Sequence, residues 1–443
     1  MIHTFSLLDK HFCLDVFSGS LLQVDEIVKK ILLSNSSDYN SGEFLPFSKD
    51  EFNSALKEVE ALKREGILDS KPALREPSEF NGVIKSMCLN ITHRCNLACS
   101  YCFADGGDYG ASDKGDMTLE TAKAAIDFLI EKSSTNYNLE VDFFGGEPLL
   151  NFEVVKGAVE YARSLEQAKG KKFRFTLTTN ALHLPDTAID FINSQMHNVV
   201  ISIDGRKEVH NYNRSTKNKS PSFDIVLENA KRLTKNRKAD YFVRGTFTSD
   251  NLDFTNDVLA MYDYGFKGIS LEPVVLKENH PQAITQKHVP QIVAEYEKLA
   301  GKYLEYRQSG KWFTFFHFNL NLYDGPCEKK LLSSCGAGCG YIAVTPSGKI
   351  YPCHQFISLP AYEIGDVIKK QYDKTIPLKF GSKNTVTAKP KCSDCWAQYY
   401  CSGGCAAANV KYSGTISEPC PVSCELMKKR IECALAIFAI ENS

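Results

Sequence analysis

The stretch Cys95-Asn-Leu-Ala-Cys99-Ser-Tyr-Cys102 places three thiols close together in the chain. It follows an apolar run at residues 87–92, which predicts a strand, and no helical pattern begins before the third cysteine. We therefore expect a loop to hold all three thiols. Thiolates of cysteine ligate iron–sulfur clusters, and a cubane cluster normally takes four of them. With three, the last iron is ligated by a distant cysteine or is left open for a substrate or cofactor.

Zinc is the other interpretation of this loop. A zinc knuckle needs a fourth Cys or His at short spacing, and His93 lies only two residues before Cys95. That spacing is poor for zinc. From this stretch alone, both an open iron–sulfur cluster and a metal site of another kind remain candidates.

The pattern Cys95, Cys99, Cys102 followed by Phe103 resembles the signature of the radical S-adenosylmethionine (SAM) enzymes. The resemblance implies that these three cysteines hold a catalytic [4Fe-4S] cluster whose open iron chelates the amino and carboxylate groups of SAM. An electron then cleaves the sulfonium to methionine and a 5'-deoxyadenosyl radical, which abstracts a hydrogen atom from the substrate.

The composition is that of an ordinary globular protein. The chain has 443 residues, enough for two or three domains, with 43% hydrophobic and 24% charged residues. A net charge of -1 gives no field that attracts nucleic acid. No run approaches the ~20 apolar residues needed to span a membrane, and charges near the N-terminus interrupt any signal-peptide core. We therefore expect a cytoplasmic protein without nucleic-acid or membrane partners, whose 16 cysteines are metal ligands more than disulfides.

Residues 1–80 are predicted to form a small separate unit. Alternating apolar residues at 12–17 and 21–24 predict a hairpin, and Asp25 is placed to cap a helix that ends at Leu33. On its own, this unit is typical of a packing appendage.

A second helix is predicted over residues 49–66, with Gly66 as its stop. The order of hairpin and helices resembles the winged-helix, PqqD-like recognition elements that precede many peptide-modifying enzymes. That resemblance implies that a leader peptide adds to the edge of the hairpin as an extra strand. Residues 71–82, which contain Pro72 and Pro77, are predicted to be the linker.

Strands and helices alternate from residue 83 to 315, which predicts an α/β fold with a parallel sheet. The predicted strands are 87–92, 141–144, 173–178, 199–203, 241–247 and 268–274. The predicted helices are 119–132, 152–165, 186–194, 223–234, 254–264 and 289–306. Six repeats favour the partial, TIM-like (β/α)6 barrel that the radical SAM resemblance implies. An eight-fold barrel is the alternative, with its missing pair supplied by the cysteine-rich tail.

Residues Gly145-Gly146-Glu147-Pro148 end the second predicted strand. The two glycines allow a backbone to approach a ligand closely, and Glu147 offers an acceptor for an ammonium group. At this distance from the cysteine loop, the motif resembles the one with which the family binds the amino group of SAM.

Other strand ends carry further candidates for the SAM pocket. The resemblance implies that Asn180 and Ser202 line it, with Ser202 near the ribose or the carboxylate. Arg214 is a candidate partner for the SAM carboxylate, because a guanidinium binds a carboxylate bidentately, although such arginines often only hold loops together. Arg244 and Glu272 are weaker candidates and are expected to be structural.

The tail, residues 316–443, carries the pattern Cys392-x2-Cys395-x5-Cys401-x3-Cys405. Four cysteines at such spacing most often hold zinc. Together with the first motif, however, the pattern resembles the SPASM domain, which carries two auxiliary [4Fe-4S] clusters. Three clusters are then expected in the whole chain.

The resemblance also implies the auxiliary ligands. The first auxiliary cluster would take Cys335, Cys353 and Cys405, and the second would take Cys392, Cys395, Cys401 and Cys424. Either Cys327 or Cys339 is a candidate for a further ligand of the first; if neither binds, a substrate thiolate has room there. The cysteines expected to be spare or simply buried are Cys13, Cys88, Cys420 and Cys433.

Taken together, the chain resembles the peptide-modifying radical SAM enzymes, and its Cys335-Gly-Ala-Gly and Cys353-His-Gln segments are most similar to the SCIFF-peptide maturases. The resemblance implies a thioether link between a cysteine of a ribosomal precursor peptide and a carbon of an acceptor residue. The thiolate would attack the carbon radical, and an auxiliary cluster would accept the surplus electron. A flavodoxin or ferredoxin is the expected electron donor.

Two alternatives stay open. An anaerobic sulfatase-maturing enzyme shares the barrel and tail, needs no leader-binding unit and uses a carboxylate as base to form formylglycine. A non-catalytic iron–sulfur electron carrier would use the barrel as a scaffold and would not cleave SAM.

Overall fold

The predicted alternation of strands and helices is confirmed in the computed structural model, which describes residues 1–34, 38–72, 82–110, 115–320, 322 and 335–443. The strands are β4 (Ser86–Thr92), β5 (Asn138–Gly145), β6 (Lys172–Thr179), β7 (Asn198–Ser202), β8 (Asp240–Phe247) and β9 (Gly268–Pro273). The helices are α4 (Leu119–Lys132), α5 (Phe152–Lys169), α6 (Asp186–Gln195), α8 (Phe223–Lys235), α9 (Thr255–Asp263) and α10 (Val289–Gln308). A short helix that the sequence did not predict, α7 (Lys207–Asn213), lies between β7 and α8.

Side chains alternate along the strands, as the period of two requires. In β5, Leu139, Val141 and Phe143 are fully buried, whereas Asp142 and Phe144, on the opposite face, are only half-buried. β6 repeats this alternation. The buried face packs beneath the crossover helices, so the other face of the sheet is left to line the interior of the barrel.

Further short strands lengthen the sheet on both sides. These are β10 (Thr314–Phe315), β11 (Tyr341–Val344), β12 (Lys349–Tyr351), β13 (Gly365–Asp366) and β14 (Gln371–Tyr372). The 11-stranded sheet has the order β10-β9-β8-β7-β6-β5-β4-β11-β12-β13-β14. It is parallel from β10 to β11 and antiparallel from β11 to β14.

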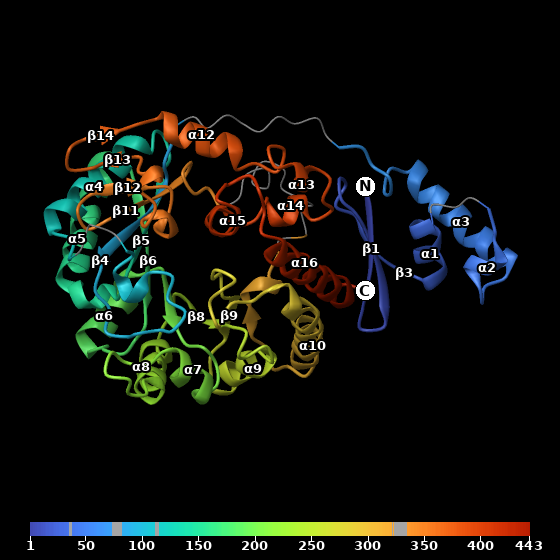
Figure 1. Cartoon of the computed structure of the whole chain (residues 1–443), viewed down its shortest axis with the longest axis horizontal. Coiled ribbons are helices and arrows are strands. Elements are labelled where there is room, and N and C mark those ends of the chain that lie inside the picture. Colours follow the sequence, from blue (N-terminus) through green and yellow to red (C-terminus); the bar gives the residue numbers. More distant parts are fainter. Residues whose placement is uncertain (35–37, 73–81, 111–114, 321, 323–334) are drawn as a thin grey trace.

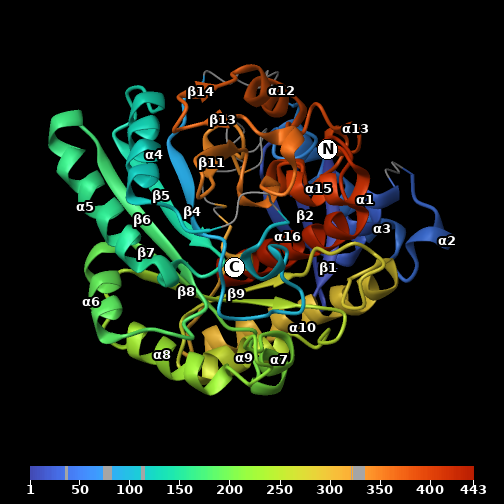
Figure 2. The same cartoon turned by 60° about the vertical axis from the view of Figure 1, so that its left-hand side comes forward.

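The six strands and six helices of the predicted partial barrel are confirmed, and two further parallel strands extend the sheet. Strand β10 follows the last barrel helix, and β11 comes from the tail. Within the described residues β10 and β14 do not pair with each other, so the barrel stays open. Figures 1 and 2 show helices α4, α5, α6, α8 and α9 around the outside of the curved sheet, with the tail on its open side.

The N-terminal unit is a three-stranded antiparallel sheet followed by helices. Its elements are β1 (Ile2–Leu7), β2 (Lys10–Asp15), β3 (Leu21–Val24), α1 (Glu26–Ser34), α2 (Ser41–Phe44) and α3 (Lys49–Arg64). The predicted strand at 12–17 was placed two residues too late, because the Asp15 carboxylate accepts backbone N–H groups of Phe17 and Ser18 and turns the chain there. Strand β1 was not predicted.

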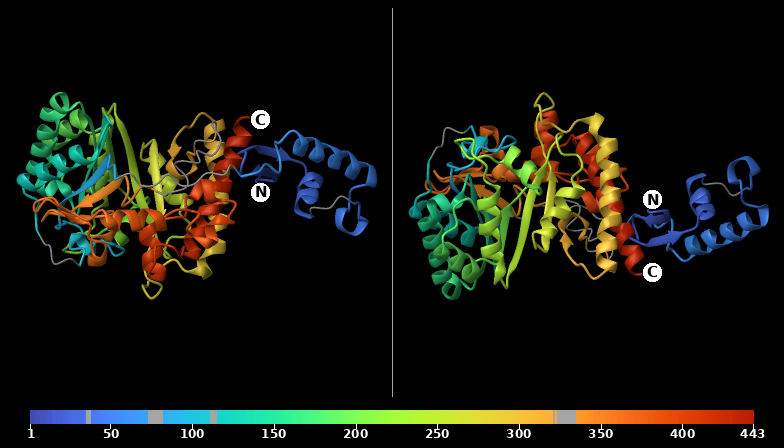
Figure 3. Two further views of the ribbon diagram at one scale, coloured as in Figure 1. Left: turned by 90° about the horizontal axis from the view of Figure 1, so that it is seen from above. Right: turned by 90° about the horizontal axis from the view of Figure 1, so that it is seen from below.

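The two halves of this unit pack differently. Buried residues of the sheet, such as Phe12 and Leu14, belong to the same hydrophobic core as the barrel, whereas the helices have a small core of their own around Phe44 and Phe52. Figure 3 shows these helices projecting away from the rest of the molecule.

The tail contributes helices as well as cysteines. They are α12 (Thr375–Lys383), α13 (Pro390–Ser393), α14 (Gln398–Cys401), α15 (Ala406–Ser413) and the long α16 (Pro421–Glu441). Helix α16 packs against α10, and its Glu432 accepts a hydrogen bond from His3 of β1, 3.0 Å away. His3 also stacks on Trp396, with ring centroids 3.7 Å apart. The N-terminal sheet is thus held against the segment that carries the predicted second auxiliary cluster. Among the described helices, none combines the length and the apolar character that a membrane crossing requires.

Candidate functional site

The cysteine loop begins where β4 ends, at the carboxyl edge of the parallel sheet. Burial first, and the nearby Cys102 thiol among the further causes, raise the pKa of Cys95 and Cys99. The pKa of Cys99 is raised to about 12. Three neutral thiols gain little from such crowding, but a bound metal deprotonates its cysteine ligands outright. The arrangement therefore fits a metal-bound thiolate set.

Backbone hydrogen bonds fix the loop to the segment that follows α7. Ala98 N donates to Ser215 O at 2.8 Å, and Ser100 N donates to Asn213 O at 2.9 Å. The Cys95 thiol itself accepts the backbone N–H of Leu97. Such N–H···S bonds are among the means by which proteins tune iron–sulfur ligands.

Tyr101, inside the cysteine motif, anchors the loop from below. Its hydroxyl donates to the two carboxylate oxygens of Asp204, at 2.7 and 2.9 Å, and accepts from Arg214 Nη1 at 2.9 Å. Asp204 is fully buried. Burial raises its pKa to about 6, although Arg214 and Tyr101 oppose the shift. The three residues form one buried network directly beneath the cysteines.

The glycines at the end of the second strand let the cysteine loop come close. A Cβ on Gly145 would lie 2.4 Å from Thr92 O, and one on Gly146 would lie 2.2 Å from Arg94 O. The backbone that leads into Cys95 therefore requires glycine at both positions. That these glycines also approach a ligand stays a prediction.

Glu147 is buried, with 2% exposure, and its carboxylate is engaged within the protein. It accepts from Asn180 N at 2.7 Å, from the Thr179 hydroxyl at 2.8 Å and from Leu149 N at 3.1 Å. Burial raises the pKa of Glu147 to about 7 against these hydrogen bonds. Within the protein, this carboxylate joins the ends of β5 and β6. Its contact to an ammonium ligand stays a prediction.

The other predicted pocket residues lie at neighbouring strand ends. The Asn180 side-chain amide donates to Asn96 Oδ1 at 2.7 Å and approaches Cys95 Sγ at 3.6 Å, so it reaches the cysteine loop. Ser202, the last residue of β7, is half-buried. Arg214 is 8% exposed, and its Nε is buried without a hydrogen-bond partner among the described residues. That free donor is available to an anionic group such as a carboxylate.

A group of aromatic and basic side chains connects this edge of the barrel to the tail. The His354 ring lies 4.7 Å from that of Phe144 and 5.7 Å from that of Phe103. Lys411 Nζ lies 5.4 Å from the Phe103 ring centroid and donates to Gln355 Oε1 at 3.0 Å. The Lys411 cation is near Cys405, Cys353 and Cys102, so it lies between the first thiol set and a tail set.

Glu272, on β9, has a structural role. It accepts from Arg430 Nη2 of α16 at 3.1 Å and lies 3.4 Å from His317 Nε2. Although burial opposes ionisation, the Arg430 and His317 charges hold the pKa of Glu272 at about 2. Arg244, by contrast, is exposed and forms no side-chain hydrogen bond or ion pair within the part of the chain that the structure describes.

Cys335, Cys353 and Cys405 come together in the tail. Burial first, and then the neighbouring Cys405 and Cys335 thiols, raise the pKa of Cys353 to about 12. Backbone N–H groups of Gln355 and Phe356 donate to the Cys353 sulfur. Those of Ala407 and Ala408 donate to Cys405.

The choice between Cys327 and Cys339 stays open. Cys339 lies near Cys335, and its Sγ is 4.0 Å from the Pro377 carbonyl oxygen. Cys327 lies outside the described residues.

Cys392, Cys395, Cys401 and Cys424 form the third set. Burial first, and then the Cys401, Cys392 and Cys395 thiols, raise the pKa of Cys424 to about 12. The backbone N–H groups of Gly404 and Gly403 donate to Cys401. Cys13, Cys88 and Cys433 are buried, and Cys420 is half-buried. Cys88 lies near Cys353 of the second set.

The three sets consist of cysteine alone, which is the usual ligand of iron–sulfur clusters. Ligands of a cubane bind separate irons at its corners, so they stand further apart than the ligands of a single zinc ion. Within the described ranges, no three or more His, Cys, Asp or Glu side chains are arranged to hold one metal ion.

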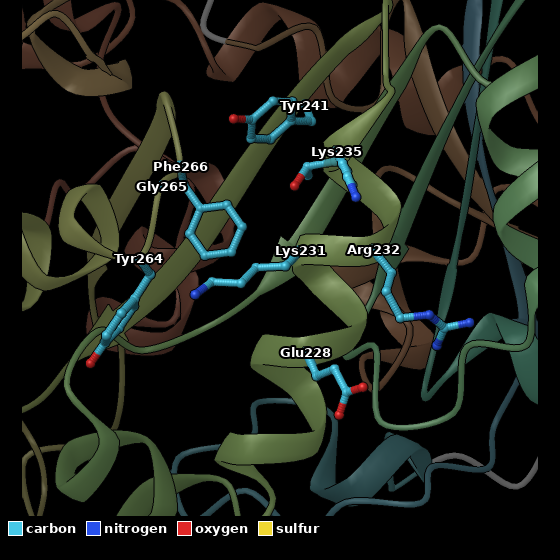
Figure 4. A pocket seen from close by; sticks show the side chains of 9 residues that line it. Glu228, Lys231, Arg232, Lys235, Tyr241, Tyr264, Gly265 and Phe266 are labelled. Carbon is cyan, nitrogen blue, oxygen red and sulfur yellow. The ribbon is translucent and has the colours of Figure 1, made fainter.

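A pocket of about 460 Å³ lies elsewhere, between α8, the start of β8 and the end of α9. Figure 4 shows Lys231 and the rings of Tyr264, Phe266 and Tyr241 around it. Tyr241 stands at the amino end of its strand, opposite the edge that carries the cysteine loop. This pocket is therefore separate from the candidate site.

Several site residues were missed from the sequence. Asp204 and Lys411 gave no signal, because a lone aspartate or lysine is common in any chain. Tyr101 lies within the cysteine motif and His354 directly follows Cys353, so only their positions indicated a role.

The chain is similar in sequence to known proteins. The profile of the Radical SAM superfamily matches residues 89–249. An uncharacterized protein of Methanocaldococcus jannaschii is 30% identical over 220 residues, which are 49% of this chain and 71% of that protein. The radical SAM cyclopropyl synthase TigE of Paramaledivibacter caminithermalis is 24% identical over 365 residues, 78% of this chain and 72% of that protein. A cysteine-type anaerobic sulfatase-maturating enzyme of Clostridium novyi is 23% identical over 340 residues, 73% and 88% of the two chains.

Solved structures share the fold. Native anSMEcpe with bound AdoMet superposes with a TM-score of 0.65 at 22% identity, over 81% of this chain and 100% of that one. Streptococcus suis SuiB bound to the precursor peptide SuiA superposes with a TM-score of 0.53 at 16% identity, over 95% of this chain and 98% of that one. At these identities the likeness shows the fold alone.

Proposed function

The chain belongs to the radical SAM superfamily, and from this membership we propose that it modifies a ribosomally made, cysteine-rich precursor peptide by forming a thioether cross-link. The observation that carries the proposal is the grouping of ten cysteines into one set of three beside the barrel and two sets in the tail. When bound, the first cluster and SAM would supply the 5'-deoxyadenosyl radical that removes a hydrogen atom from the substrate.

The chain's own residues would prepare the site for this chemistry. The proposed cluster ligands are Cys95, Cys99 and Cys102, held by Tyr101 and the backbone bonds described above. Gly145 and Gly146 would let the loop lie close to the end of β5, and Glu147 would position the Asn180 segment. Gly145, Gly146 and Glu147 are the proposed contacts of the SAM amino group. The other proposed SAM contacts are Asn180, Ser202 and Arg214, with the unpartnered Nε of Arg214 directed to the carboxylate.

We propose that residues 1–80 bind the leader of the precursor peptide. In the N-terminal sheet β1 and β3 are the edge strands, and an edge strand offers unpaired backbone groups to a peptide. Strand β1 faces Trp396 and Glu432 of the tail through His3. Strand β3, whose residues are half-buried or exposed, is therefore the proposed site of peptide addition.

A sulfatase-maturing activity is the second candidate, because such enzymes are among the relatives. That reaction needs a carboxylate base. Glu272 is a poor base with a pKa of about 2, since Arg430 and His317 hold it ionised. Glu147 and Asp204 are enclosed by donors from the protein. These engagements favour the thioether reaction, in which a metal-bound thiolate needs no separate base.

The test uses the full chain, reconstituted with iron and sulfide without oxygen and reduced in the presence of SAM. Release of 5'-deoxyadenosine is expected, and none is expected from the Cys95→Ala/Cys99→Ala/Cys102→Ala variant. An electron carrier would release none in either case. A flavodoxin or ferredoxin should replace the chemical reductant.

The substrate is tested with a leader-bearing, cysteine-rich peptide. Each thioether removes two hydrogen atoms from the peptide, which mass spectrometry detects together with the loss of one free thiol. Deleting residues 1–80 should abolish turnover of this peptide but leave slow SAM cleavage. Unchanged peptide turnover, or a product that carries formylglycine, would contradict the proposed function.

A further inference from the structure

Lys389 is a buried cation in the cysteine-rich tail. Its side chain is 0% exposed, and its Nζ donates to Asn384 Oδ1 and to Gly403 O, both at 2.8 Å. Both acceptors are neutral, and no carboxylate forms an ion pair with Lys389 within the described residues. Burying an ammonium without a counter-charge is strongly unfavourable. A stable fold with Lys389 in this position therefore calls for negative charge nearby.

The surrounding cysteines are the source of that charge. The thiols of Cys392, Cys401, Cys405 and Cys424 all act electrostatically on Lys389. Gly403 lies in the link from Cys401, in the third thiol set, to Cys405, in the second. The hydrogen bond to Gly403 O thus holds the ammonium on the backbone that connects the two sets. Neutral thiols would leave this ammonium uncompensated, whereas cluster-bound thiolates would compensate it.

The backbone of this link is shaped around the lysine. Ser402, Gly403 and Gly404 have φ values of +55°, +80° and +72°, three consecutive left-handed residues. This turn brings the N–H groups of Gly403 and Gly404 to the Cys401 sulfur and the Gly403 carbonyl to the ammonium. A Cβ on Gly403 would lie 2.9 Å from Lys389 Nζ, so a larger side chain there would displace the lysine.

We propose that Lys389 raises the reduction potential of the auxiliary clusters. When a cluster takes up one electron, its net charge becomes more negative by one. A fixed cation in a poorly polarisable interior stabilises the more negative state and so favours reduction. The proposal rests on the proposed cluster ligands but not on the identity of the peptide. In the proposed reaction the surplus electron passes from the substrate radical to an auxiliary cluster, and a higher potential makes that cluster a better acceptor.

The experiment uses the full chain with Cys95, Cys99 and Cys102 replaced by alanine, so that only auxiliary clusters are reconstituted. Dithionite supplies the electrons, and the midpoint potential is measured by electron paramagnetic resonance during the titration. We expect Lys389→Met to make the potential more negative than in the parent, and Lys389→Arg, which keeps the charge, to restore most of the difference. Lys379→Met is the matched control, because Lys379 is an exposed lysine of α12 in the same tail, and it should leave the potential unchanged.

A second variant keeps Lys389 but offsets its positive charge with a neighbouring carboxylate. Asn384→Asp has nearly the same shape and places a carboxylate against the ammonium, so the potential should again become more negative. Potentials that stay unchanged in both Lys389→Met and Asn384→Asp, with the iron content of the parent, would overturn the proposal. Absence of iron from the triple-alanine parent would overturn the proposed auxiliary ligands, and this inference with them.

Discussion

Replacing Tyr101 by phenylalanine tests whether the network beneath the cysteines holds the loop. The change removes the hydroxyl that donates to Asp204 at 2.7 and 2.9 Å and accepts from Arg214 at 2.9 Å. The fully buried Asp204 then keeps the backbone N–H of Thr246, at 3.1 Å, and an Arg214 Nη1 that stands 3.9 Å away.

The expected magnitude follows from these contacts. A hydrogen bond to a charged group contributes about 1.5–3 kcal/mol, and a buried partner left behind adds its desolvation cost. Because Arg214 can move closer to Asp204 and recover part of the loss, we expect Tyr101→Phe to lower the free energy of unfolding by about 3 kcal/mol.

The loss should also depend on pH. Burial raises the folded-state pKa of Asp204 to about 6, above its ordinary value of 3.8. A carboxyl whose pKa is higher in the folded state stabilises the fold at pH values below its unfolded pKa. For Asp204, this stabilisation is lost as the pH rises through 6. Removing the Tyr101 donor raises this pKa further, so the deficit of the variant should be larger at pH 8 than at pH 5.

Tyr161→Phe is the matched control. Its hydroxyl donates to the two carboxylate oxygens of Asp127, at 2.9 and 3.1 Å, but on the protein surface. That variant should lose less than about 0.5 kcal/mol. Urea unfolding of the metal-free chain measures the free energy of unfolding of both variants, relative to the wild type, at pH 5 and at pH 8. If Tyr101→Phe loses no more than Tyr161→Phe, or loses more at pH 5 than at pH 8, the reasoning about the network is wrong.

Three further predictions follow from other contacts. Gly146→Ala places a Cβ 2.2 Å from Arg94 O, so it should displace the cysteine loop. It should lower the free energy of unfolding by at least about 1–3 kcal/mol and lower the iron content after reconstitution. The control Gly42→Ala, at an exposed position of α2, should change neither quantity. The pKa of Glu147 is raised to about 7, so the wild type is expected to lose stability as the pH rises from 4.5 through 7. Glu147→Gln should make this loss smaller. If the urea midpoints of the variant fall with pH as steeply as those of the wild type, Glu147 is not the source of the loss. Glu272→Gln should lower the free energy of unfolding at pH 7 by about 3–5 kcal/mol, because it leaves the buried Arg430 without its counter-charge. A loss no larger than that of an exposed Glu→Gln change would refute the buried ion pair.

The periodic pattern of the central segment was enough to predict its fold. Each of the six strands and six helices from β4 to α10 was expected near its observed position, because strong alternation and amphipathic spacing are local properties of the chain. Strands β10 and β11 were missed as parts of the barrel. They are two and four residues long, and only their pairing with β9 and β4 makes them strands.

The spacing of the cysteines predicted metal-binding thiols, because residue types and the intervals between them can be read directly from the sequence. What the sequence could not decide is which charges surround them. The Tyr101–Asp204–Arg214 network joins residues more than a hundred positions apart, and the tail brings Arg430 to Glu272 across 158 positions. Lys389 is likewise one lysine among many until the turn at Gly403 buries it between two thiol sets. Burial and electrostatic coupling depend on distance in space, so only the tertiary structure determined them.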